Sequence, residues 1–318
     1  MADEELWGVR NAFFLGCYQQ AISEAMTASV SDASRVLCNF CVQRRSHISW
    51  APPSSPLTSP LACADMHRAY IEQAQYRMVI DDVSNDAPMP LQAVKLLASY
   101  MAGGRDAKEM ALVQLKEWLS SPRAAAEPQL LLVAALVYMH EGDHKEALKC
   151  VHQSTDLETM ALVSHIYLSM SRVDLARKQV GLMQQQDDDA TLTKLAGAWV
   201  SMAEGGDKCQ DALYEFQELG EKYNMSLTLT NGMALANLHM GKYDEAERLL
   251  QEGLAKSSSE PDALANTVVT MTYLRKPADV SNRFVNQLRA VAPSHAWTVK
   301  HQELEASFDR CAAAMNGA

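Results

Sequence analysis

The stretch that decides the fold is Gly142-Asp143-His144-Lys145-Glu146-Ala147, and it recurs as Gly241-Lys242-Tyr243-Asp244-Glu245-Ala246. A looser copy begins at Gly206-Asp207 and ends at Asp211-Ala212. Glycine suits the left-handed backbone position at which a helix ends. Each copy therefore predicts a tight turn, followed by a helix whose early alanine must be small because another helix lies close to it.

The alanines belong to a longer series with a regular spacing. Ala111, Ala147, Ala176, Ala212 and Ala246 follow one another at intervals of 36, 29, 36 and 34 residues. Tetratricopeptide repeats, which are pairs of helices joined by a turn, recur at about 34 residues. The spacing predicts an all-α, tetratricopeptide-like superhelix, and the alternative is an ordinary helical bundle without a true repeat.

The first helix of each pair tests this prediction independently. The tetratricopeptide pattern places a small residue three positions before an aromatic one, so that both lie on one helical face. The pattern occurs in the pairs Ala135 with Tyr138, Ser164 with Tyr167 and Ala196 with Trp199, while Ala234 is followed by Asn237. Spacing and packing pattern therefore favour the repeat over the ordinary bundle.

The outer parts of the chain fit the repeat less closely. Residues 16–21 resemble the turn, residues 276–281 occupy the next register after Ala246, and a helix from about 293 to 308 is expected to cap the stack. Residues 39–64 do not fit, because their Pro and Ser residues break helices and cannot build a core. The prediction is a single domain over residues 1–318 with a flexible insertion at residues 39–64.

Composition argues against several classes of function. Lys and Arg number 28 and Asp and Glu number 39, so the formal charge is −11, and an acidic surface repels nucleic acid. The longest apolar run, residues 130–139, is shorter than the roughly 20 residues that span a bilayer. The acidic start carries no secretory signal, and the seven Cys have no disulfide spacing. We expect a cytosolic protein without a transmembrane segment or a nucleic-acid partner.

One motif resembles a catalytic metal site. His140-Glu141-Gly142-Asp143-His144 has the zincin pattern H-E-x-x-H, which requires both histidines on one face of an unbroken helix. The repeat register places a turn at Gly142, so the helix is expected to stop between the two histidines. No catalytic residue is predicted.

Two further groups of residues could hold a cation. Cys38, Cys41, Cys63 and His67 could supply four zinc ligands, but nothing around them resembles a compact zinc finger, and ordinary thiols are the favoured interpretation. Asp187-Asp188-Asp189 precedes a predicted helix, where carboxylates cap free N–H groups. No metal or other cofactor is predicted.

The remaining candidate for function is a surface. The first helices of a tetratricopeptide solenoid line its concave side, and the register places Gln129 and Glu158 there together with several apolar residues. Apolar residues at inward positions suggest an extended or helical peptide buried along the groove. The alternatives are a closed superhelix that covers these residues itself, or a register that is wrong by one residue. The predicted partner-binding residues are Leu132, Leu136, Met139, His165, Leu168, Asn231, Leu235, Leu238 and His239.

The residues around and between the repeats resemble the epsilon subunit of coatomer, the COPI vesicle coat. The blocks that carry the resemblance include Glu5-Leu6-Trp7-Gly8-Val9-Arg10-Asn11-Ala12-Phe13-Phe14-Leu15-Gly16, Asp174-Leu175-Ala176-Arg177-Lys178, Ala198-Trp199-Val200-Ser201, Phe216-Gln217-Glu218 and Phe308-Asp309-Arg310. The resemblance covers nearly the whole chain except residues 39–64, for which the family pattern has no counterpart.

The resemblance implies a non-catalytic coat subunit whose inner surface embraces the C-terminal part of the alpha subunit. It also implies a cytoplasmic protein that an Arf GTPase recruits, with the rest of coatomer, to Golgi and COPI-coated vesicle membranes, for transport from Golgi to endoplasmic reticulum and within the Golgi. The alternative is another tetratricopeptide adaptor, such as a co-chaperone that binds a peptide carboxylate. That function needs Lys, Arg and Asn side chains that converge from the first helices, and only Asn231 of the predicted set has this character.

Overall fold

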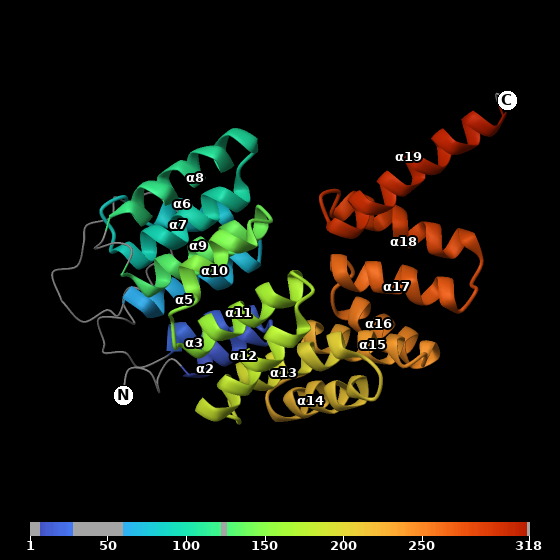
Figure 1. Cartoon of the computed structure of the whole chain (residues 1–318), viewed down its shortest axis with the longest axis horizontal. Helices are drawn as coiled ribbons and strands as arrows, with labels where there is room; N and C mark the ends of the chain where they lie inside the picture. The colour runs from blue at the N-terminus through green and yellow to red at the C-terminus, as the bar shows by residue number, and fades with distance from the viewer. Residues whose placement is uncertain (1–6, 28–59, 122–125, 317–318) are drawn as a thin grey trace. The chain divides into compact units, whose positions relative to one another are not determined.

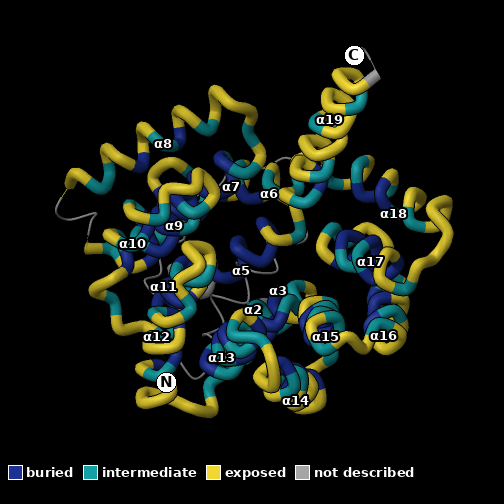
Figure 2. Tube along the Cα trace, turned by 45° about the vertical axis from the view of Figure 1, so that its right-hand side comes forward, coloured by how far each residue is buried: buried dark blue, intermediate teal, exposed yellow. Residues whose placement is uncertain are grey.

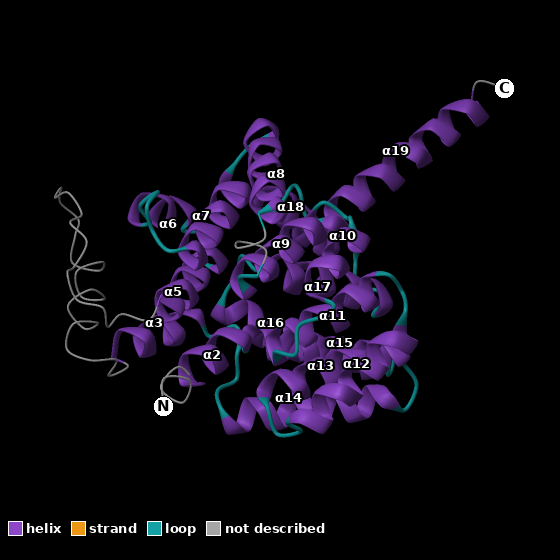
Figure 3. Cartoon of the chain, turned by 60° about the vertical axis from the view of Figure 1, so that its left-hand side comes forward, coloured by secondary structure: helices purple, strands orange, loops and turns teal. Residues whose placement is uncertain are grey.

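The protein is described by a computed structural model that covers residues 7–27, 60–121 and 126–316. Over these ranges it has 17 α-helices and no strand, which confirms the all-α prediction (Figure 3). Its contacts divide the chain into two compact units, residues 1–200 and 201–318, which are described separately. The prediction of a single domain stays a prediction. None of the helices in the described ranges has the length and hydrophobicity needed to cross a membrane.

Unit 1 is built from consecutive helical hairpins. Its helices are α2 (Trp7–Phe14), α3 (Tyr18–Thr27), α5 (Pro60–Glu72), α6 (Tyr76–Asp82), α7 (Met89–Ala102), α8 (Arg105–Ser120), α9 (Pro128–His140), α10 (His144–Val151), α11 (Leu157–Ser169), α12 (Val173–Gln186) and α13 (Thr191–Glu204), whose last residues belong to unit 2. Helices pair within hairpins, as α9 does with α10, and first helices also pack on one another, as α5 does on α7 and α7 on α9 (Figure 1).

Unit 2 continues the same arrangement. Its helices are α14 (Lys208–Lys222), α15 (Leu227–His239), α16 (Tyr243–Lys256), α17 (Pro261–Tyr273), α18 (Ala278–Val291) and α19 (Ala296–Asn316). Each of them packs on the next, and α15 also contacts α17. The predicted last helix is present, but it begins at Ala296 and runs to Asn316, beyond the expected end near residue 308.

One hydrogen bond recurs in six of the turns. A backbone N–H donates to the carbonyl oxygen five residues earlier, at 2.8 to 3.0 Å, which is the six-to-one bond of the Schellman motif. The donor–acceptor pairs are Cys17–Ala12, Gln75–Tyr70, Asp143–Tyr138, Arg172–Tyr167, Lys242–Asn237 and Lys276–Met271. The residue before each donor has a positive φ, which confirms the predicted left-handed turn at Gly142 (φ 77°) and Gly241 (φ 74°).

The spacing also predicts turns at Gly103-Gly104 and at Ser171-Arg172, and the structure differs from the prediction at the first of them. Gly103 and Gly104 have φ values of −86° and −72°, so the expected left-handed residue is absent between α7 and α8. Gly103 is instead required by close packing, because a Cβ there would lie 2.5 Å from the Cβ of Ala107. The turn that the spacing predicts at Ser171-Arg172, between α11 and α12, is present, and Ser171 (φ 57°) takes the left-handed conformation without being glycine.

Burial confirms the register of the repeats. The five alanines of the series, Ala111, Ala147, Ala176, Ala212 and Ala246, are between 0 and 5% exposed. The small residues of the first helices are buried as well, including Ala135, Ser164 and Ala234. Small side chains at these positions let two helices approach closely, as the repeat requires.

The predicted insertion ends earlier than expected. Residues 39–59 lie outside the described residues, but residues 60–64 form the beginning of α5, and Ala64 is fully buried. Pro60 is the first residue of that helix, where proline is favoured because its missing N–H would have no partner in the helix. The end of the insertion at residue 64 was therefore predicted wrongly.

Candidate partner-binding surface

The H-E-x-x-H motif is divided by a turn. Helix α9 ends at His140 and α10 begins at His144, with Gly142 in the left-handed conformation between them. The hydroxyl of Tyr100 donates to Glu141 Oε1 at 2.5 Å, so the carboxylate that would act as base is already bound. Burial and the neighbouring Lys108 lower the pKa of His140. The predicted helix break is confirmed.

The other cation candidates also have structural partners. Cys38 and Cys41 lie outside the described residues, while Nδ1 of His67 lies 2.6 Å from the carbonyl oxygen of Cys63 on α5. Oδ1 of Asp187 accepts hydrogen bonds from the N–H groups of Asp189 and Ala190, both at 3.1 Å, in the turn before α13. In the part of the chain that the structure describes, no three His, Cys, Asp or Glu side chains are grouped so that they could hold a metal ion.

The nine predicted partner-binding residues lie on three first helices. Leu132, Leu136 and Met139 are on α9, His165 and Leu168 on α11, and Asn231, Leu235, Leu238 and His239 on α15. Leu132 is only 4% exposed, the two histidines are exposed, and the other six are half-buried. Neighbouring helices therefore cover part of the apolar surface that a free solenoid was expected to expose.

A hollow of about 720 Å³ lies in unit 1 at the amino-terminal ends of α9, α11 and α13. Apolar side chains line it from four helices, among them Phe14, Leu132, Leu157 and Leu192. Its acidic side chains include Glu158, in the first turn of α11. The hollow thus contains one predicted residue, Leu132, and one residue that the register had placed inward, Glu158.

Three buried polar atoms in this hollow lack a hydrogen-bond partner within the described structure. They are Nδ2 of Asn11, Oε1 of Gln129 and Oγ1 of Thr191. Their residues are between 3 and 9% exposed. Buried polar atoms are normally hydrogen-bonded, and leaving one unsatisfied costs about 1–3 kcal/mol. Each of the three atoms exposes less than 1 Å² of its surface, so they lie behind the wall of the hollow and do not face its open space.

A smaller hollow of about 90 Å³ adjoins the first between α11 and α13. Leu192 lines both hollows, and the predicted residues His165 and Leu168 line the smaller one with Trp199. Partial desolvation lowers the pKa of His165. The two hollows together form one inner surface of unit 1, which we call the inner hollow, with mainly apolar walls.

A buried charged network supports one wall of the inner hollow. The guanidinium of Arg68 on α5 lies 3.4 Å from Oδ1 of Asp65 and binds Glu158 on α11. Arg10 on α2 reaches the same Asp65, with 3.1 Å between Nε and Oδ2. Arg68 also lies over the ring of Phe13, 4.8 Å from its centroid. The network joins three helices that are far apart in sequence, and sequence reasoning missed Arg10, Asn11, Asp65 and Arg68.

The predicted residues of unit 2 have a different setting. Nδ2 of Asn266 on α17 donates to Oδ1 of Asn231 at 2.9 Å, so this amide joins two first helices. Leu235 and Leu238 are half-buried on the same helix, α15. Asn231, the one residue that suggested carboxylate binding, is therefore partly used in packing.

Solved structures resemble this fold at low sequence identity. The Cut9–Hcn1 hetero-tetramer of the APC/C aligns with a TM-score of 0.57 at 13% identity, over 89% of this chain and 51% of that chain. A tetratricopeptide repeat protein from Parabacteroides merdae aligns with a TM-score of 0.55 at 12% identity, over 73% of this chain and 93% of that chain. These likenesses confirm the tetratricopeptide-like fold.

Sequence relatives identify the family. The family model described as coatomer epsilon subunit matches residues 2–58 and 47–316. Coatomer subunit epsilon-1 of Oryza sativa subsp. japonica is 39% identical over 96% of both chains, and its counterpart in Arabidopsis thaliana is 37% identical over 96% of both. Coatomer subunit epsilon of Dictyostelium discoideum is 29% identical over 97% of this chain and 98% of the relative. The chain therefore belongs to the coatomer epsilon subunit family, whose members are non-catalytic components of the COPI vesicle coat.

Proposed function

We propose that this chain binds and stabilises the alpha subunit of coatomer through the inner hollow. The observation that carries the proposal is a cavity of about 720 Å³ at the amino-terminal ends of three first helices, lined by apolar side chains that include Leu132, Leu157 and Leu192. A segment of another protein would supply apolar side chains to pack against these walls. Family membership makes another coatomer subunit the expected source of that segment, and the C-terminal part of alpha is our choice.

The cellular setting follows from membership of the coat. We propose that the chain acts in the cytoplasm, peripherally on Golgi and COPI-coated vesicle membranes, after an Arf GTPase has recruited coatomer. Its role is then structural, in transport from Golgi to endoplasmic reticulum and within the Golgi. A carboxylate-binding adaptor is less well supported, because Asn231 is hydrogen-bonded to Asn266.

The test introduces carboxylates into the inner hollow. Leu168→Asp with Leu192→Asp adds two charges at half-buried positions that line the smaller hollow. The control variant is Leu182→Asp with Val280→Asp, at two exposed positions on second helices. We expect the hollow variant to lose at least nine-tenths of the alpha subunit in co-purification, while the control variant keeps it. Circular dichroism must show equal helix content, and retention of alpha by a folded hollow variant would contradict the proposal.

A further inference from the structure

Helix α8 exposes large apolar side chains to solvent. Of its 16 residues only Ala111 and Leu115 are buried, and its extensive contacts among the described helices are with α7. Met110 is 73% exposed and Val113 is 67% exposed, and they lie three residues apart on one face. Figure 2 shows exposed residues along most of α8. A helix that exposes two large apolar side chains on one face has the appearance of a helix that lacks a neighbour.

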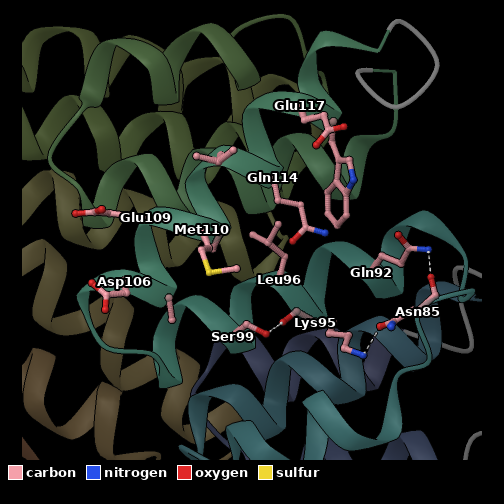
Figure 4. Close-up of a pocket in the computed structure, with 14 residues that line it drawn as sticks. Asn85, Gln92, Lys95, Leu96, Ser99, Asp106, Glu109, Met110, Gln114 and Glu117 are labelled. Atoms are coloured by element: carbon pink, nitrogen blue, oxygen red, sulfur yellow. Dashed lines mark hydrogen bonds between the residues drawn. The ribbon is translucent and has the colours of Figure 1, made fainter.

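These side chains belong to a groove between α7 and α8. The groove encloses about 1000 Å³ (Figure 4). Its large apolar lining residues are Leu96 of α7 and Met110, Val113 and Trp118 of α8. From Asp106 to Trp118 it follows 13 residues of α8, which corresponds to a rise of about 18 Å, or just over three helical turns.

A short preceding helix explains why the groove is open. Helix α6 has 7 residues, whereas the second helices α12 and α16 have 14 each. Asn85, which comes shortly after α6 in the sequence, also lines the groove. The groove therefore lies on the side of α7 that is near the end of α6. With two turns, α6 covers a shorter length of α7 than a second helix of 14 residues would cover. The open space therefore lies beside the end of a helix that is shorter than α12 and α16.

The charges of the groove are mainly negative. Its exposed carboxylates are those of Asp106, Glu109 and Glu117, of which Glu109 is paired with Arg105 at 3.2 Å. Lys95 supplies the single lysine or arginine side chain among the residues that line it. The amine of Lys95 donates to the carbonyl oxygen of Val83 at 2.6 Å and to Oδ1 of Asn85 at 2.9 Å, so it is already engaged. An occupant with lysine or arginine side chains would complement this rim.

We propose that the α7–α8 groove is a docking site for a short amphipathic helix of another protein, with apolar residues on one face and Lys or Arg beside them. Two antiparallel helices with an apolar seam accept a third helix by the same packing that α7 uses on α5 and α9. The site is independent of the inner hollow, since the two sets of lining residues have no member in common.

The test uses a synthetic 14-residue peptide with Leu and Lys at helical spacing and a fluorescent label. Its anisotropy is measured with the full chain, with Met110→Asp plus Val113→Asp, and with the Leu182→Asp plus Val280→Asp control. We expect at least tenfold weaker binding for the groove variant and no weakening for the control. The direction of the change in affinity is decisive, because added carboxylates would strengthen binding if a basic peptide were held only by unspecific electrostatic attraction. Equal or tighter binding by the groove variant would overturn the proposal.

Two further measurements locate the site. Hydrogen exchange with bound peptide should show protection in residues 89–120, and protection elsewhere alone contradicts the proposal. A peptide with Glu in place of Lys should bind at least tenfold more weakly. The groove variant should still co-purify with the alpha subunit, which separates this result from the test of the inner hollow. If Met110→Asp plus Val113→Asp instead converts a dimer of the free chain into a monomer, the groove joins two copies and the proposal is wrong.

Discussion

The inner hollow and the α7–α8 groove both have apolar side chains in their walls, but they differ in whether their polar groups are buried or exposed. In the inner hollow, polar atoms of Asn11, Gln129 and Thr191 are buried without partners, and a buried charged network forms a wall. In the groove, the carboxylates of Asp106, Glu109 and Glu117 are exposed. The inner hollow is thus part of the folded core of unit 1, whereas the α7–α8 groove lies on the outside of a core that is complete without it. Substitutions of buried residues in the hollow, such as Leu132, should lower stability as well as binding, and those of exposed residues in the groove should affect binding alone.

The largest contrast should come from two arginines. Arg68→Ala leaves Asp65 and Glu158 without their buried partner, which we expect to destabilise unit 1 by about 3–5 kcal/mol. Arg105→Ala removes the partner of Glu109 at an exposed site, and surface ion pairs contribute about 0–1 kcal/mol. Urea denaturation of both variants measures the difference. Equal losses would contradict the distinction between the two surfaces.

A smaller contrast should come from apolar side chains. Leu132→Ala removes a buried side chain in the inner hollow, and such changes cost about 2–5 kcal/mol. Met110→Ala in the groove removes a side chain that is largely exposed already, so we expect a change within about 0.5 kcal/mol. Thermal unfolding of the two variants checks the order. A loss for Met110→Ala as large as that for Leu132→Ala would show that α8 needs Met110 for its own packing.

The smallest effect concerns the turns of the two hairpins that support the inner hollow. Ser171→Gly removes a side chain from a left-handed position, so we expect a gain of about 0.5–1 kcal/mol. Gly142→Ala makes the opposite change in the equivalent turn and should lose about 1 kcal/mol. Both sites are measured by denaturation, with partner binding as the control. A change in the same direction at both turns would show that they are not equivalent.

Much of the repeat architecture was predictable because its signals are local. The buried alanine series and the turns at Gly142 and Gly241 follow from spacing and from the conformation of single residues. The left-handed turns at Ala74 and Arg275 were missed, since neither residue type indicates a positive φ. Helix α5 was partly missed as well, because Pro60 was interpreted as part of an insertion and not as the first residue of a helix.

Less of the candidate site was predictable. The register placed Leu132 and Glu158 inward, and both line the inner hollow. The pair Arg68 and Glu158 is separated by 90 residues, so nothing in the local sequence connects them. Asn11 and Thr191 line the same cavity only because α2 and α13 lie near each other, and the sequence does not show that their side-chain atoms lack partners there.

By itself the sequence determined the helical hairpins, their register, the break inside His140-Glu141-Gly142-Asp143-His144 and the likeness to the coatomer epsilon subunits. These depend on contacts within one or two turns of the chain, or on residues read in order. The tertiary structure alone decided which inward residues are covered by neighbouring helices, how the buried charges pair and which apolar side chains of α8 are exposed. Those properties depend on distances between helices that lie far apart in sequence, and only folding brings such helices together.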